Sequence, residues 1–201
     1  MRRPWLLLFI LIAFSRTGAG AADDAKIIAL GASFTAGKGV ASSETFTARL
    51  QGLLHAHGYR VQVVNQGADG DTTADLMKRL ATAVPDGTAG VILAYDRAND
   101  EKAGLSKEQT VKNIETIVDE LLGRQIHVLL VVRGRDSAEA QARLAQFRDF
   151  AADRDLPMMP LEQPPSMLAG AAHATASEYS NIAARMLAPV ESLLMTAGVE
   201  R

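Results

Sequence analysis

The sequence of 201 residues contains no cysteine, which excludes disulfide bonds, a thiol nucleophile and the lipid-anchored form of an exported protein. No apolar run in it reaches the roughly 20 residues that a membrane-spanning helix needs. What is present, 48% hydrophobic and 22% charged residues, is the composition of an ordinary globular protein. The length suits one compact domain.

The N-terminal segment differs in kind from the rest. Arg2 and Arg3 precede an apolar run of about ten residues from Trp5 to Phe14, and small residues fill positions 19–22. This arrangement predicts a secretory signal peptide over residues 1–21, a mature domain over 22–201, and a periplasmic or secreted protein. Because the apolar run is short, we expect no stable membrane span after the signal is cleaved.

Clusters of basic residues and metal-ligand spacings are also missing. Cleavage after Ala21 would leave 18 Lys and Arg against 23 Asp and Glu, a net charge of −5. An acidic chain with no basic run argues against nucleic acid and against strong binding to anionic lipid. His55 and His57 lie two positions apart on a predicted helix and point in different directions, so we expect no metal site.

From Lys26 onward, short apolar runs alternate with longer stretches of helical period, the pattern of a parallel sheet covered by helices. We therefore predict an α/β fold of three layers, α/β/α, with a five-stranded, mostly parallel sheet of the flavodoxin type. Short apolar runs predict strands at 26–30, 60–65, 90–94, 127–132 and 157–161, and most of them are rich in Val, Ile and Leu, as buried parallel strands should be. Apolar stripes predict helices at about 46–57, 107–124, 138–150 and 179–190, and prolines predict irregular structure over 162–172.

Ligands of an open parallel sheet bind beyond the carboxyl ends of its strands, so the loops that follow the strands are where a binding site is expected. The first runs from Gly31 to Gly39. Five residues separate Gly31 from Gly37, and Gly39 follows Lys38, which does not fit a phosphate-binding P-loop. Ser33 sits where a nucleophile could be presented at the edge of the sheet; the alternative is a helix cap.

The other three loops each contribute one polar or flexible position. Gly70 in the second loop allows a backbone N–H to approach a substrate oxygen closely, although a plain strand-to-helix turn explains it as well. Asn99 in the third loop supplies a neutral amide donor suited to an oxyanion. His173, shortly before the last helix, is flanked by small alanines and by no large apolar residue that would suggest a role in the core.

Serine, glycine, asparagine and histidine thus follow one another on four successive loops, and here the chain resembles the SGNH (GDSL-like) hydrolases. The stretch 27–37, IIALGASFTAG, is similar to the family's first block, LGDSLTAG, and 65–72, NQGADGDT, is similar to its second, NAGVSGDT. The stretch 98–100, AND, is similar to the end of the third block, GGND. Within this family the chain resembles the bacterial periplasmic thioesterases, arylesterases and lysophospholipases.

The resemblance implies a serine esterase or thioesterase that acts on small acyl or lipid esters and needs no cofactor or metal. Ser33 would be the nucleophile and His173 the base. The backbone N–H groups of Ser33 and Gly70 and the amide of Asn99 would form the oxyanion hole.

Three departures from the family's pattern imply an incomplete triad and weak activity. The aspartate three residues before the histidine is Gly170 here, and the aspartate beside the nucleophile is Ala32. The glycine pair of the third block is Arg97-Ala98, and Arg97 either pairs with Asp96 or Asp100 or meets an anionic group at the substrate's edge. Glu162 and Glu178 are the nearest candidates for a replacement acid. The alternative function is a non-catalytic periplasmic binding or partner protein that has lost the triad acid.

Overall fold

The computed structural model describes residues 24–95, 97–134, 137–168, 170 and 172–201. Five strands in this part form one sheet in the order β2-β1-β3-β4-β5, and every neighbouring pair is parallel. The strands are β1 (Ala25–Gly31), β2 (Val61–Gly67), β3 (Gly90–Tyr95), β4 (His127–Gly134) and β5 (Met158–Glu162). The strand order is that of the flavodoxin-like sheet, so the predicted fold class is confirmed.

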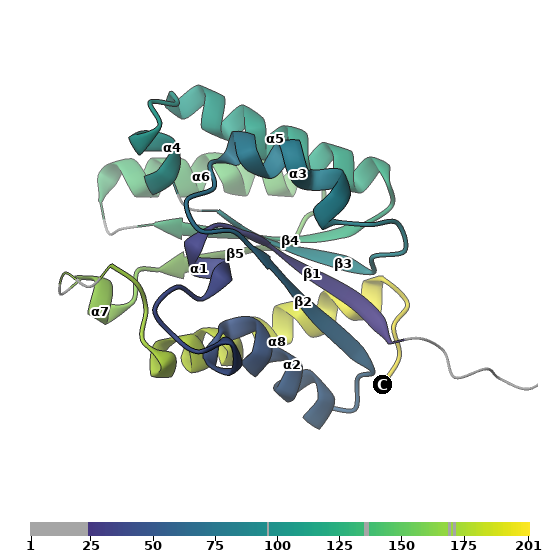
Figure 1. The fold of residues 1–201 in the computed structure, drawn as a ribbon. Helices are drawn as coiled ribbons and strands as arrows, with labels where there is room; N and C mark the ends of the chain where they lie inside the picture. Colours follow the sequence, from purple (N-terminus) through teal and green to yellow (C-terminus); the bar gives the residue numbers. More distant parts are fainter. Residues whose placement is uncertain (1–23, 96, 135–136, 169, 171) are drawn as a thin grey trace, which may run out of the picture.

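Helices cover both faces of the sheet, giving the three layers seen in Figure 1. One face carries α3 (Thr73–Ala83), α5 (Lys107–Gly123) and α6 (Ala138–Ala152), and the other carries α2 (Phe46–Ala56) and α8 (Ala176–Thr196). Shorter helices lie in the loops: α1 (Ser33–Ala36), a 3-10 turn η1 (Ser42–Glu44), α4 (Ala98–Lys102) and α7 (Pro165–Leu168).

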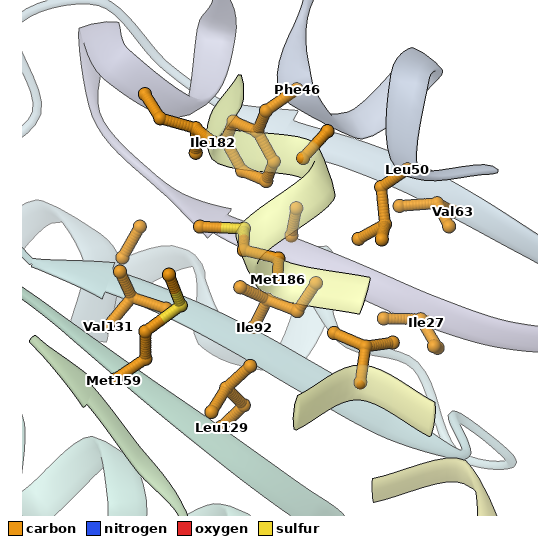
Figure 2. Packing of buried hydrophobic residues seen from close by; sticks show 14 of the residues in the cluster. Ile27, Phe46, Leu50, Val63, Ile92, Leu129, Val131, Met159, Ile182 and Met186 are labelled. Atoms are coloured by element: carbon orange, nitrogen blue, oxygen red, sulfur yellow. The ribbon is translucent and has the colours of Figure 1, made fainter. Parts of the chain in front are cut away.

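Each face of the sheet has its own apolar core, because a strand's side chains alternate between the two faces. Figure 2 shows the core under α2 and α8, where Ile27, Ile92 and Leu129 of neighbouring strands meet Phe46 of α2 and Met186 of α8. The side chains of the other face pack against α3, α5 and α6. Burial on both faces explains why the inner strands β1, β3 and β4 read as nearly continuous apolar runs, whereas the edge strands β2 and β5 also carry exposed residues.

The predicted elements agree with the structure except at their ends and in one segment. Residues 162–172 were expected to be irregular, but β5 extends through Glu162 and α7 occupies Pro165–Leu168. A proline fits here because the first position of a helix needs no backbone N–H.

The predicted signal peptide, residues 1–21, lies outside the described residues. Within the described residues, none of the helices combines the length and hydropathy required to cross a bilayer.

Candidate active site

The four loops singled out by sequence emerge at the same edge of the sheet, beyond the carboxyl ends of the strands (Figure 1). Ser33 is the first residue of α1, directly after β1. Gly31 and Gly67 are needed here for space, because a Cβ on Gly31 would collide with Thr35 and one on Gly67 would collide with the backbone of Ala36. The absence of a Cβ at these two glycines thus lets α1 pack tightly on the ends of β1 and β2.

Buried aromatic residues fix the position of α1, the helix that carries Ser33. The hydroxyl of Tyr179 donates a hydrogen bond to the carbonyl oxygen of Phe34 at 2.9 Å, and both side chains are buried. The Phe34 ring stacks on Phe46 and on Tyr179, with centroids 5.2 and 5.5 Å apart. Burial raises the pKa of Tyr179 to about 12, so this hydroxyl stays protonated and keeps donating.

Ser33 and Asn99 line the same small cavity, of about 30 Å³. Asn99 lies in the first turn of α4, and its side-chain amide donates to the carbonyl oxygen of Asp71 at 2.9 Å. Arg133, at the carboxyl end of β4, lines the same cavity and stacks its guanidinium over the Phe34 ring at 4.3 Å. The structure therefore brings together the predicted nucleophile, one predicted oxyanion donor and a cation.

Asn99 is held in place by its neighbour Asp100, which is 1% exposed. The Asp100 carboxylate accepts hydrogen bonds from the backbone N–H and hydroxyl of Thr73, at 2.7 and 2.6 Å, and from the hydroxyl of Thr110 at 2.7 Å. Asn113 completes the network by donating to the Thr73 hydroxyl at 2.9 Å. These bonds join α4 to α3 and α5.

The second loop carries Gly70, whose φ of +86° is a conformation that favours glycine. Arg79 fixes this loop: its Nε donates to the Asp71 carboxylate at 2.6 Å, and its Nη2 donates to the carbonyl oxygens of Gly31 and Gln66 at 3.1 and 2.9 Å. One guanidinium thus ties the ends of β1 and β2 to the loop that carries Gly70.

His173 lies beside the loop that follows α1, since a Cβ on Gly39 would stand 3.8 Å from the Cβ of His173. Burial lowers the pKa of His173 from its ordinary value of 6.5, and the charge of Lys38 lowers it further, whereas Asp69 opposes them. A histidine with a lowered pKa is neutral at pH 7 and therefore available as a base. In the described part of the chain, no hydrogen bond joins His173 to Ser33.

The two candidate acids are placed differently from a triad acid. Glu178 accepts hydrogen bonds from the backbone and hydroxyl of Ser166 and from the backbone and hydroxyl of Thr175, so it caps α8 and ties it to α7. Burial alone would raise the pKa of Glu178, but these hydrogen bonds outweigh it and lower the pKa to about 2. Glu162 is exposed at the end of β5.

Arg97 pairs with a different acid from those that the sequence suggested. Its Nη1 lies 2.9 Å from Glu139 of α6, whereas Asp100 is turned inward to the threonines. Asp96, the other candidate, lies outside the described residues. A partner 42 positions away in the chain could not be inferred from the local sequence.

Comparison with known proteins agrees with this arrangement. Residues 29–189 match the family model of the GDSL-like lipase/acylhydrolases. The chain belongs to this family. The match begins within β1 and ends within α8, so it covers the sheet and all four loops of the GDSL-like site.

The chain is similar in sequence to two curated relatives and, in both sequence and fold, to one solved structure. The chain is 28% identical to an arylesterase of Vibrio mimicus over 112 residues, 56% of each chain. It is 27% identical to the esterase TesA of Pseudomonas aeruginosa over 105 residues, 52% of each chain. The matches thus span about half the length of these relatives. The structure of AlinE4, an SGNH-hydrolase family esterase, is 26% identical with a TM-score of 0.63, covering 87% of this chain and 99% of that one.

Proposed function

We propose that this chain is a serine esterase or thioesterase that hydrolyses small acyl or lipid esters. The observation that carries the proposal is the shared cavity of Ser33 and Asn99, with His173 beside the adjoining loop. Family membership supports the same chemistry.

In the proposed reaction, the Ser33 oxygen attacks the ester carbonyl carbon while a ring nitrogen of His173 takes the hydroxyl proton. The carbonyl oxygen gains negative charge and is stabilised by the backbone N–H groups of Ser33 and Gly70 and by the Asn99 amide. When the bond to the leaving group breaks, His173 returns the proton to the departing alcohol or thiol. Water then attacks the acyl-enzyme by the same route, releasing the acid and restoring Ser33.

The triad acid is the weak part of this machinery. Gly170 and Ala32 carry no carboxylate, and Glu178 is occupied in capping α8. In a serine protease, loss of the acid's charge costs roughly 10⁴ in rate, so we expect slow turnover. The same observation favours the second candidate function, a non-catalytic binding or partner protein that kept the fold.

The deciding experiment is hydrolysis of p-nitrophenyl esters from acetate to palmitate by the mature chain and by its Ser33→Ala variant. Turnover by the wild type alone would support the esterase. A fluorophosphonate probe supplies a second readout, since it labels an activated serine even where turnover is slow. No turnover and no label on Ser33 would leave the binding protein as the better proposal.

We also propose that the protein is exported to the periplasm or secreted, on the strength of the N-terminal pattern. This proposal is tested by measuring the intact mass of the protein recovered from each cell fraction. A chain that begins at Ala22 in the periplasm or medium supports export with cleavage after Ala21. A full-length chain in the cytoplasm would overturn it.

A further inference from the structure

A second, larger cleft adjoins the cavity beside Ser33. It has a volume of about 420 Å³ and shares two lining residues, Ala98 and Arg133, with the smaller cavity. Its walls come from α4, the end of β4, the start of α6 and the segment around α7. A ligand whose reacting group lies at Ser33 and which extends past Ala98 and Arg133 would enter this cleft.

Arginines dominate the lining of the cleft. Arg97, Arg133 and Arg143 face it, against the two acids Glu101 and Glu139. Glu139 is shared between Arg97 and Lys107, which lies 2.6 Å away, and its side chain is 54% exposed. One carboxylate that already serves two cations neutralises little of the charge of Arg143.

Two of the arginines have donor atoms that protein groups leave unused. The Nε atoms of Arg97 and Arg143 are buried and have no hydrogen-bond partner among the described residues. Arg143 also forms no ion pair with any acid in that part of the chain, although it lies close enough to Glu139 to lower the pKa of that carboxyl, after the larger effect of Lys107. Buried donors of a cation without an acceptor are costly, so the protein's own groups leave these two guanidiniums incompletely satisfied.

We propose that this arginine cleft, defined by Arg97, Arg133 and Arg143, binds a negatively charged group of the substrate, a carboxylate or a phosphate. The inference rests on the proposed esterase function and names its substrate class: a short ester with an anionic end. A guanidinium matches such groups because it offers parallel N–H donors to two oxygens. The apolar lining is limited to small residues and Met167, which suits a compact charged group better than a long alkyl chain.

The kinetic test compares two esters with the same leaving group, mono-p-nitrophenyl glutarate and p-nitrophenyl butyrate. Arg143→Gln should lower kcat/KM for the charged ester by about tenfold or more and leave the neutral ester unchanged. Arg148, exposed on the same helix, provides the matched control, and Arg148→Gln should change neither ester. Equal losses on both esters, or equal losses in both variants, would overturn the proposal.

A binding test keeps this inference separate from the proposed reaction. Glutarate dianion should raise the Tm of the wild type relative to sodium chloride at the same ionic strength, because a ligand that binds only the folded state stabilises it. The shift should disappear in Arg143→Gln and persist in Arg148→Gln. Binding without turnover would support the cleft while the esterase proposal fails. The absence of any glutarate effect on Tm, together with no preference for the charged ester, would refute the cleft.

Discussion

The side-chain amide of Asn99 donates a hydrogen bond to the backbone carbonyl of Asp71 at 2.9 Å. This bond ties the third loop to the second, which carries Gly70, so the two proposed oxyanion donors outside α1 are held at a fixed separation. An amide has two N–H hydrogens, and one remains for the substrate. Preorganised donors of this kind lose no reorganisation energy when charge develops.

Asn99→Ala should therefore remove a donor and loosen the second loop at once. We expect kcat for p-nitrophenyl esters to fall by about 10² to 10³, the usual loss for one oxyanion donor. Asn113→Ala is the matched control: Asn113 belongs to the same hydrogen-bond network through Thr73 but does not line the cavity. A similar loss of kcat in both variants would show that the network's stability, and not the Asn99 amide, sets the rate.

Asp100 should be a positioning residue whose main effect is on stability. Asp100→Ala leaves the donors of Thr73 and Thr110 without their acceptor in a buried site. We expect the free energy of unfolding to fall by about 3 kcal/mol and Tm to fall by about 6–12 °C. The change in Tm is measured by recording thermal unfolding with circular dichroism.

Asp100→Asn is the informative comparison, because it keeps one carbonyl acceptor and the volume of the side chain. Its Tm should lie between those of the wild type and Asp100→Ala. If Asp100→Asn and Asp100→Ala melt at the same temperature as the wild type, the network does not hold α4 in place.

The sequence alone was enough to predict the sheet, because its inner strands are buried apolar runs and stretches of helical period separate the strands along the chain. The family-like blocks also led to Ser33 and Asn99 as candidate site residues, and both line one small cavity in the structure. Their catalytic roles stay a prediction. The position of His173 relative to Ser33 could not be predicted from the sequence, because it depends on a loop whose residues are distant from Ser33 in the chain.

Three residues of the site were not found from sequence. Arg79 looks like an ordinary solvent-side residue of an amphipathic helix, yet it holds two strand ends and Asp71. Asp100 was not singled out as a support because its partners Thr73 and Thr110 are 27 and 10 positions away. Arg133 did leave a signal: a single cation at the end of the otherwise apolar run 128–132 is hard to explain as core.

The charges around His173 predict how activity depends on pH. As a general base, His173 works only when neutral, so kcat/KM should fall as the pH drops through its pKa, which lies below 6.5. Lys38→Gln removes a positive charge that lowers this pKa. The pKa should therefore rise, and the acid limb of the kcat/KM profile should move to higher pH.

Asp69→Asn should shift the pKa of His173 in the opposite direction from Lys38→Gln. Asp69 pairs with Lys38 at 2.6 Å and raises the pKa of His173, so its removal should move the acid limb to lower pH. Both shifts should shrink at high salt, because the Lys38 and Asp69 side chains are half exposed. An acid limb that stays at the same pH in both variants would mean that His173 is not the titrating base.

Restoring the family's aspartate at position 170 should not restore a full triad. Gly170 has a φ of +100°, which L side chains rarely adopt, so an aspartate there is strained. Space is not the obstacle, because no atom of the described residues lies within 4 Å of the position that its Cβ would take. We expect Gly170→Asp to leave kcat nearly unchanged and to lower the free energy of unfolding by about 1–2 kcal/mol. Gly170→Asn carries the same strain without the charge and should match it in both kcat and Tm. A rise of kcat in Gly170→Asp alone would show that this loop rearranges to present the carboxylate, and that the missing acid was the chief defect of the site.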